Sequence, residues 1–239
     1  MWMRMVIPNT SQGDDSRYPF KLSPFSSHSR LLEIAGAGSG QRLLDVGCAQ
    51  GDLTWRLQNK GWQTIGIEPD PNDAKIAVSR GLSVQICSAE EYFAMNPDTF
   101  DVIVFGDVLE HLPDPKALLR TASSRLRSGG RILVSLPNVA HLSVRLSLLF
   151  GSFQYQSRGI LDETHLRFFT RSSTKELFRA SGLSIVRLRT TPAPLELAFP
   201  WLASQAFYPH LDRLHARAAG VLSGPLAYQF VAELCLSGD

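Results

Sequence analysis

The chain has 239 residues, 44% of them hydrophobic and 19% charged, a composition typical of a globular protein with a buried core. Its 24 basic and 22 acidic residues nearly cancel, so the net charge of +2 predicts no face for a nucleic acid or an anionic membrane. The three cysteines, Cys48, Cys87 and Cys235, are far apart, which argues against a disulfide framework or a cysteine metal cluster and favours the reducing cytoplasm.

The organisation of the chain is predicted from its apolar runs. None approaches the ~18 residues of a transmembrane helix, so no membrane span is expected. We predict a single domain, 1–239, in which residues 1–23 form a leader without the apolar core of a signal peptide. Residues 24–136 would be the ligand-binding core, 137–169 a cap or insertion, and 170–239 the C-terminal half of the fold.

Strand and helix signals alternate from residue 24 to residue 136. A helix is predicted over 24–36. The apolar runs that follow are RLLDVG, TIGIEP, SVQIC, DVIVFGD and RILVSLP. Continuous runs of Val, Ile and Leu indicate strands buried on both faces, as in a parallel sheet. Strands alternating with helices predict βαβ units with right-handed crossovers, and so a doubly wound α/β fold.

Capping residues place the helices between these strands. Asp52 is expected to cap one helix, Asp70 a second and Asp114 a third, the last two with proline directly behind the cap. The third helix is expected to run through Leu126 to the glycine pair at 129–130.

The C-terminal part continues the alternation after an irregular segment at 137–169. TRSSTKELFRASG predicts a helix capped at Thr170 or Ser173, LSIVRLRT a strand, FYPHLDRLHARAAGVL a helix and LAYQFVAELCL a closing strand. The stretch at 195–208 is rich in Leu, Phe and Trp. It leaves two interpretations open, a homodimer interface or the cover of a lipid-like ligand.

The sharpest motif is the loop DVGCAQG at 45–51, between the first predicted strand and the next helix. Glycine at such a turn lets the backbone approach a ligand at the helix N-terminus, although a tight turn without a ligand is the alternative. Gly47 and Gly51 are four residues apart with Ala49 between them, which is not the G-x-G-x-x-G of dinucleotide enzymes. Asp45 would repel a pyrophosphate but could serve a ligand carrying an ammonium group.

An acidic residue follows at the end of the next predicted strand. Glu68 lies some 20 residues beyond the glycine loop, where a carboxylate can accept hydrogen bonds from both hydroxyls of a ribose. The alternative is a solvated acid at a strand end.

Five segments together resemble the class I S-adenosylmethionine-dependent methyltransferase family over residues 40–190. They are LLDVGCAQG, GIEPD, SAEE, FDVIVFGDVLEHLPDP and LRSGGRILVSLPN, in consistent order and spacing. PNVAHLSVRLSLLFGSFQY and GILDETHLRFFT resemble a small-molecule subgroup that often accompanies glycosyltransferases or natural-product pathways. The resemblance implies a Rossmann-like, seven-stranded, mostly parallel sheet with helices on both faces and one antiparallel strand near the C-terminus. It also implies S-adenosyl-L-methionine as the cofactor and S-adenosyl-L-homocysteine as the product.

The resemblance further implies which residues bind the cofactor. The glycine loop would contact its methionine part, the acid after the second strand its ribose, and the SAEE segment the edge of its adenine. The end of the fourth strand would lie beneath it. The expected cofactor residues are Asp45, Gly47, Cys48, Gly51, Glu68, Pro69, Asp70, Ala89, Glu90, Asp107, Val108 and Leu109. At Glu90 the alternative is simply the start of a helix.

Methyl transfer is an in-line displacement, so the protein has to align the acceptor and, for a hydroxyl, remove a proton. No clustered ligand set demands a metal, and none is predicted. Histidine is the first choice as general base. The candidates, in order, are His165, His111 and His141, each with a structural role as the alternative. His165 leads because Asp162 and Glu163 could orient its imidazole and raise its pKa.

The sequence therefore predicts a methyltransferase acting on a small-molecule acceptor, with an oxygen of a sugar or natural product preferred over nitrogen or carbon. A catalytically silent cofactor-binding partner and an N-methyltransferase on a small amine are the alternatives. A nicotinamide oxidoreductase is disfavoured by the glycine spacing. A nucleic-acid methyltransferase is disfavoured because GDVLEH stands where an Asn/Asp-Pro-Pro-aromatic block would be expected.

Overall fold

A computed structural model describes residues 23–238 of the chain. The leader predicted at 1–23 lies outside the described residues except for Ser23. No helix in the described range is both long enough and apolar enough to cross a membrane.

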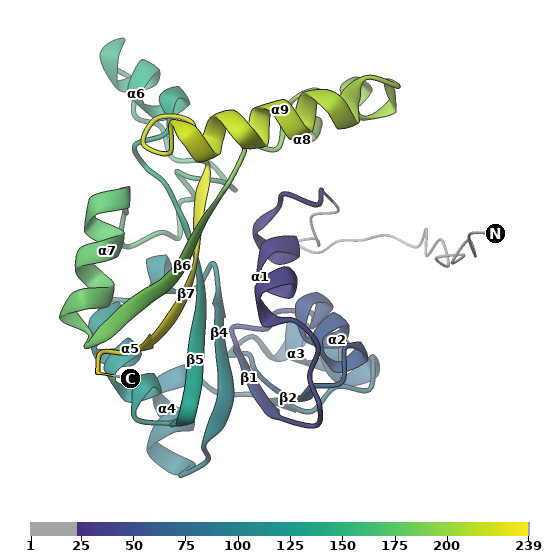
Figure 1. Cartoon of the computed structure of the whole chain (residues 1–239), viewed down its shortest axis with the longest axis vertical. Helices are drawn as coiled ribbons and strands as arrows, with labels where there is room; N and C mark the ends of the chain where they lie inside the picture. The colour runs from purple at the N-terminus through teal and green to yellow at the C-terminus, as the bar shows by residue number, and fades with distance from the viewer. Residues whose placement is uncertain (1–22, 239) are drawn as a thin grey trace.

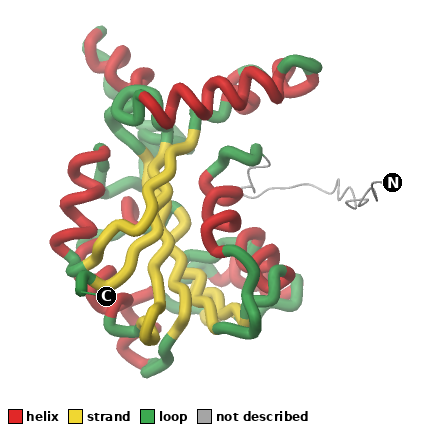
Figure 2. Tube along the Cα trace, viewed as in Figure 1, coloured by secondary structure: helices red, strands yellow, loops and turns green. Residues whose placement is uncertain are grey.

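One seven-stranded sheet runs through the centre of the molecule (Figures 1 and 2). Its strands are β1 (Arg42–Val46), β2 (Gln63–Ile67), β3 (Val84–Gln85), β4 (Phe100–Gly106), β5 (Leu126–Pro137), β6 (Leu183–Thr191) and β7 (Gln229–Leu236). Their order is β3-β2-β1-β4-β5-β7-β6. β7 is antiparallel to both of its neighbours, while the other pairs are parallel. The predicted doubly wound sheet with one antiparallel strand is confirmed.

Helices cover both faces of the sheet. They are α1 (Ser27–Ala35), α2 (Asp52–Asn59), α3 (Pro71–Ser79), α4 (Ala89–Met95), the short 3-10 helix η1 (Leu109–His111), α5 (Pro115–Ser123), α6 (Leu142–Leu149), α7 (Arg171–Ala180), α8 (Leu195–Ala198), η2 (Pro200–Ser204) and α9 (Tyr208–Val221). α1 and α2 pack on one face, and α4, α5 and α7 on the other (Figure 1).

Each face has its own apolar core. On one side Leu31 of α1 and Leu57 of α2 are buried against Val102 and Val104 of β4. On the other side α4, α5 and α7 bury large side chains such as Phe178 against the opposite surface of the same strands. The central strands are apolar on both faces because both faces are covered.

Caps decide where several helices begin. The carboxylate of Asp70 accepts a hydrogen bond from the Asn72 amide at 2.7 Å, and Asp114 and Thr170 cap α5 and α7 in the same way. These predictions are confirmed. The prediction for Asp52 is wrong, because Gly51 occupies the cap position of α2 in a left-handed conformation and Asp52 is already helical.

The helix predicted to reach residues 129–130 ends six residues earlier, at Ser123. Leu126 pairs with Phe100 of β4 instead of extending the helical face, and the next pairing of β5 is Arg131 with Val102. Residues 127–130 bulge out between these two pairings. Leu126 is spaced in the sequence like the apolar residues of the preceding helix, yet it joins the sheet. Hydrogen bonds to the neighbouring strand outweigh its local helix propensity.

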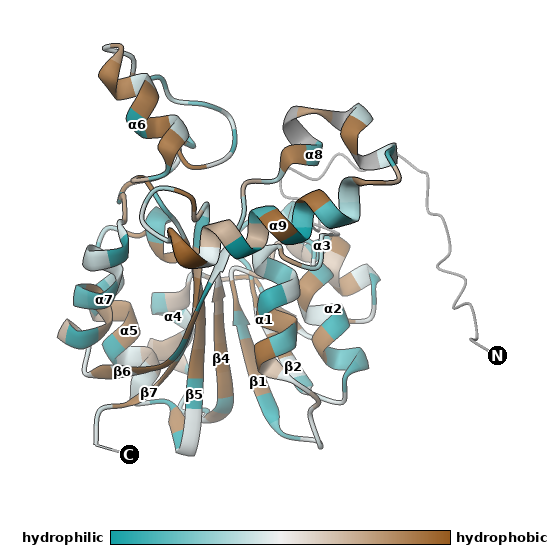
Figure 3. Ribbon diagram, turned by 45° about the horizontal axis from the view of Figure 1, so that its top comes forward, coloured by the Kyte–Doolittle hydropathy of each residue, from teal (hydrophilic) through white to brown (hydrophobic). Residues whose placement is uncertain are grey.

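The carboxyl ends of β1, β2, β4 and β5 meet at one edge of the sheet, and strand order reverses between β1 and β4. Ligands of open α/β sheets bind in the crevice at such a reversal. α8 and α9 cross above this edge, and α6, within the segment predicted to be irregular, projects beyond the body (Figure 3). The apolar residues of α6 are mostly exposed, with only Val144 buried.

Candidate functional site

The glycine loop is fastened to the end of β2. The amides of Gly47 and Cys48 both donate to the Ile67 carbonyl oxygen, at 2.8 and 3.0 Å. Gly47 has φ = 69° and Gly51 has φ = 82°, both in the left-handed region. A Cβ at Gly51 would also stand 2.3 Å from Leu82 Cδ1. Glycine is therefore required at Gly51 by backbone conformation and by space.

Ala49 is the residue of this loop that departs from glycine, and its φ is 47°. The left-handed conformation costs a residue with a Cβ about 1–2 kcal/mol, and glycine removes this cost. Part of the gain is lost because glycine makes the unfolded chain more flexible and so stabilises the unfolded state. We expect Ala49→Gly to stabilise the protein by about 0.5–1 kcal/mol in urea unfolding. Ala94→Gly, in the last turn of α4, is the control and should destabilise, by less than the ~1 kcal/mol expected in a helix interior. Equal losses in both variants would contradict the strain.

Glu68 joins the glycine loop to the loop after β2. Its Oε2 accepts from the Ala49 amide at 2.8 Å and its Oε1 from the Asp70 amide at 2.9 Å. The side chain is 8% exposed, and burial raises its pKa despite the two amide hydrogen bonds. Each carboxylate oxygen still has a second lone pair, so Glu68 can hold the loop and accept from a ligand hydroxyl together.

Asp45 is buried at the end of β1 beneath the loop. Its Oδ2 accepts from Thr54 Oγ1 of α2 at 2.6 Å. Burial, with a contribution from the negative charge of Glu68, raises the pKa of Asp45 to about 7. A cationic group bound nearby would favour its ionised form. The buried thiol of Cys48 lies against Gly66 of β2, where an added Cβ would meet its Sγ at 2.6 Å.

The remaining residues predicted to surround the cofactor lie on two sides of this loop. Ala89 is buried in the first turn of α4, and Glu90 is exposed beside it. This position of Glu90 agrees with the alternative that it simply stands at the start of a helix. Val108 faces the loop, since a Cβ at Gly47 would stand 2.7 Å from its Cγ2. Leu109 is 0% exposed and packs in the apolar core, so its side chain presents no surface to a ligand in this structure.

Asp107 directly follows β4 and gathers polar groups from three elements. It accepts from Gln229 Nε2 at 2.9 Å, from Ser135 Oγ at 2.5 Å and, at 3.4 Å, from Ser27 Oγ of α1. Its φ of 59° is in the left-handed region, which is costly for a residue with a Cβ. A strained, firmly held carboxylate at the reversal point of the sheet is a strong candidate for ligand contact.

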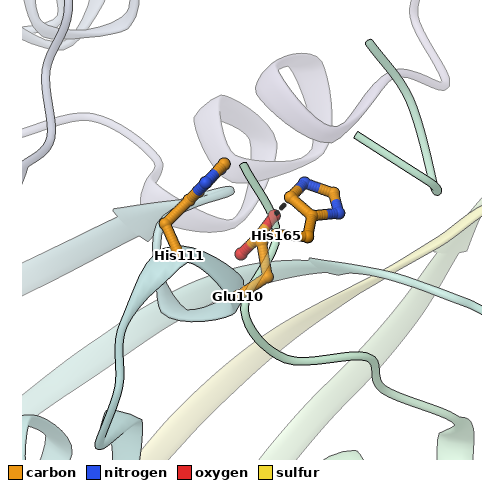
Figure 4. Close-up of side chains that lie close together, drawn as sticks. All are labelled: Glu110, His111 and His165. Carbon is orange, nitrogen blue, oxygen red and sulfur yellow. Dashed lines mark ion pairs between the residues drawn. The ribbon is translucent and has the colours of Figure 1, made fainter. Parts of the chain in front are cut away.

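Two of the three candidate histidines meet beside η1. The rings of His111 and His165 lie edge to face with centroids 4.8 Å apart (Figure 4). His165 is 9% exposed, and its Nε2 lies 4.0 Å from Oε1 of Glu110, which is 1% exposed. The sheet edge carries Glu110 and His111, and the insertion brings His165 to them.

Backbone acceptors fix the tautomers of both rings. Nδ1 of His165 lies 3.1 Å from the Ile160 carbonyl oxygen, which can only accept, so Nδ1 of the neutral ring carries the proton. Nδ1 of His111 lies 3.2 Å from the Thr164 carbonyl oxygen and 3.1 Å from its Oγ1. That hydroxyl donates to Asp162 at 2.7 Å and can only accept from the ring. Both Nε2 atoms are therefore left with free lone pairs.

The electrostatic prediction for His165 is wrong in sign. Burial and the neighbouring His111 lower its pKa, and the nearby charge of Asp162 offsets this only in part. Desolvation outweighs the carboxylate because the imidazole is held in the interior. A ring that is neutral at pH 7 can accept a proton.

His141 stands apart from the other two. It is the N-cap of α6, where its Nδ1 lies 2.8 Å from Ser143 Oγ, and its ring packs edge to face on Tyr228 with centroids 5.6 Å apart. The structure thus gives His141 a capping and packing environment, and a catalytic role stays a prediction.

Glu110, His111 and His165 also form a set that could hold a metal ion, which was not expected from the sequence. One ligand atom from each lies within 4.8 Å of the others. Two imidazoles whose other nitrogen donates to a backbone carbonyl, together with a carboxylate, suit zinc or a similar ion. Such an ion would polarise an acceptor hydroxyl and lower its pKa.

We expect Zn²⁺ to stabilise the wild-type protein in thermal unfolding, by ~2.7 kcal/mol at a concentration 100 times its Kd. Glu110→Gln, which keeps the shape of the side chain, should abolish the gain. His210→Ala, on the exposed side of α9, should leave it intact. Equal stabilisation of the Glu110→Gln variant would place the zinc elsewhere.

Comparison with known proteins identifies the family. A family model described as a methyltransferase domain matches residues 22–188. The chain belongs to this methyltransferase family. The class predicted from the glycine loop and the segments after it is confirmed.

Relatives of this methyltransferase include ubiquinone biosynthesis O-methyltransferases. That of Aeromonas salmonicida is 29% identical over 163 residues, 65% of this chain and 68% of the relative. That of Xanthomonas euvesicatoria is 33% identical over 143 residues, 57% of each. The chain spans about half of the rat mitochondrial relative, 52% of its length. A methyltransferase from Archaeoglobus fulgidus shares the fold, with a TM-score of 0.60 at 21% identity, covering 86% of this chain and 92% of that one.

Several residues of the methyltransferase's site were missed from the sequence. Glu110 was passed over between Asp107 and His111, although an acid beside a candidate histidine is a signal. Ser135 is a polar residue inside an apolar strand, a pattern that marks a buried hydrogen bond. Gln229 lies 122 residues from its partner Asp107, and no local pattern could have joined them.

Proposed function

We propose that the protein transfers a methyl group from S-adenosylmethionine to an oxygen of a small-molecule acceptor. The observation that carries this proposal is the pair of imidazoles, His111 and His165, which lie edge to face at the carboxyl edge of the sheet, each with its Nδ1 directed to a backbone carbonyl oxygen. The names of the relatives, ubiquinone biosynthesis O-methyltransferases, support oxygen as the accepting atom.

Charge supports S-adenosylmethionine as the ligand of the glycine loop. Asp45 and Glu68 place two carboxylates beneath and beside the loop. Their charge would repel the pyrophosphate of a dinucleotide, whereas a sulfonium compound bearing an ammonium group would be attracted. Asp107 directly precedes Val108, which packs on Gly47 of the same loop.

In the protein without a bound metal ion, His165 would act as the general base. Its Nε2 would take the proton of the acceptor hydroxyl while the oxygen lone pair attacks the methyl carbon and the carbon–sulfur electrons return to sulfur. The products are a methyl ether, S-adenosylhomocysteine and a protonated imidazole. Glu110, 4.0 Å away, would stabilise that imidazolium.

Aromatic side chains of 137–169 would form a wall of the acceptor site. The ring of Phe168 lies 6.3 Å from that of His165 and 6.0 Å from that of Phe153, and Tyr155 packs against the last. Phe153 and Tyr155 are 41% and 57% exposed. A row of rings that starts at the proposed base and ends at the surface suits an acceptor with an apolar or ring-shaped body.

Calorimetric titration with S-adenosylhomocysteine, and with NAD⁺ in parallel, tests the cofactor. Saturable one-to-one binding of S-adenosylhomocysteine alone is expected. Methyl transfer from labelled S-adenosylmethionine to hydroxylated sugars and aromatics then tests the acceptor. Binding of NAD⁺ in place of the sulfur compound would overturn the proposal.

A further inference from the structure

A basic hollow lies between the base of α6 and the start of α7, beside the carboxyl end of β5. Its volume is about 430 Å³. It is lined by Ala140, Arg145, Thr170, Arg171, Ser172, Lys175 and Gly224. Three of these seven residues are cationic and none is acidic.

No carboxylate in the part of the chain that the structure describes is paired with the three cations. Within residues 23–238, Arg145, Arg171 and Lys175 form no ion pair with a carboxylate. The nearby acid Glu176 is paired with Arg179 at 2.6 Å instead. In a chain with a net charge of only +2, three unpaired cations around one concave surface raise the local positive potential and attract anions.

A fully buried amide fixes the walls of the hollow. Asn138, 0% exposed, donates from Nδ2 to the carbonyl oxygens of Gly224 and Ala227 at 2.8 and 2.7 Å. Its Oδ1 accepts from the Ala140 amide at 3.1 Å, and its backbone bridges to Phe169, which directly precedes Thr170. One residue thus ties together three wall segments, so the shape is built into the fold.

Backbone and hydroxyl donors add to the positive charge. α7 begins at Arg171, and this ten-residue helix directs its positive dipole end toward the hollow, with the amides of Arg171 and Ser172, while Thr170 already caps the Ser173 amide. Arg145 is held in place by a 2.6 Å hydrogen bond from its Nε to the Ala140 carbonyl, which leaves its terminal nitrogens to donate. Guanidinium, ammonium, hydroxyl and helix amide groups are the donors that bind phosphate oxygens.

The hollow also lies near the proposed reaction site. Ser135 of β5 donates a hydrogen bond to Asp107. It precedes Asn138 by three residues of extended chain, which span about 10 Å. A small molecule carrying a phosphate could therefore reach both places.

We propose that the basic hollow binds a phosphate or diphosphate group, and that this group is part of the methyl acceptor. The second half rests on the proposed function, whereas the binding itself does not. A soluble phosphorylated molecule and a phospholipid headgroup share this chemistry.

Calorimetric titration of the full chain with inorganic pyrophosphate tests the binding. Saturable binding is expected, and the double variant Arg171→Gln/Lys175→Gln should weaken it at least about tenfold, as the loss of charged hydrogen bonds requires. Lys75→Gln removes an exposed cation on α3, outside the hollow, and should change nothing. Absence of saturable binding, or equal affinity in the double variant, overturns the proposal. Matching thermal unfolding of all three proteins excludes misfolding.

Sedimentation with phosphatidylcholine vesicles, with and without phosphatidylglycerol, separates the two sources. Binding to the anionic vesicles that the double variant loses identifies a lipid headgroup as the ligand. Pyrophosphate binding without vesicle binding identifies a soluble phosphate. A parallel titration with S-adenosylhomocysteine keeps the two proposals apart. If S-adenosylhomocysteine does not bind while pyrophosphate does, the proposed function and the assignment of the phosphate to the methyl acceptor are wrong, but the anion site is supported.

Discussion

His165→Ala is expected to lower the rate of methyl transfer roughly 10²–10⁴-fold, the range that a positioned general base contributes. The Nε2 of this residue carries the free lone pair that would take the proton. A water molecule that replaced the ring would not be held in position to take it. S-adenosylhomocysteine should bind as in the wild type, because the glycine loop is separate from His165. Initial rates with labelled S-adenosylmethionine, and calorimetry for the product, measure the two effects.

The pH dependence gives a second test of the same role. Because burial and His111 lower the pKa of His165, the ring stays neutral at pH 7 and is protonated only below the ordinary histidine value of about 6.5. The wild-type rate should therefore fall on the acid side of that value and be constant above it. His210→Ala is the matched control and should keep the full rate. Normal turnover by His165→Ala would return the ring to a packing role.

Glu68→Ala is expected to weaken S-adenosylhomocysteine binding by about 1.5–3 kcal/mol, roughly 10- to 150-fold. The substitution removes the carboxylate proposed to accept from the ribose. It also frees the Ala49 and Asp70 amides, so the loop loses its attachment to β2. Calorimetry measures the change in affinity.

A conservative variant separates the two effects. Glu68→Gln can still accept from the Ala49 amide through its single oxygen, but it can no longer accept two further hydrogen bonds as an anion. It should preserve stability better than Glu68→Ala while still losing affinity. Glu176→Ala, an exposed acid on α7, is the control and should bind as the wild type. Unchanged affinity in both Glu68 variants would remove this residue from the cofactor site.

The sequence by itself determined the sheet and the glycine loop, and the resemblance of five segments over residues 40–190 to a known family indicated the methyltransferase class. The sheet and the loop depend on information that is local in the chain. Apolar runs of Val, Ile and Leu specify buried strands, Asp-Pro pairs specify helix starts, and a glycine loop followed by Glu68 specifies a nucleotide-type site. Each signal lies within a few residues, or one βαβ unit, of what it specifies.

Only the tertiary structure decided which polar groups meet. Asp107 receives Gln229 from β7, and Glu110 receives His165 from the insertion, through contacts across 122 and 55 positions of sequence. The tertiary structure also decided the sign of the pKa shift of His165, since burial outweighs the acid beside it in sequence. Local pattern cannot supply such facts, because desolvation and long-range contacts depend on how the whole chain packs.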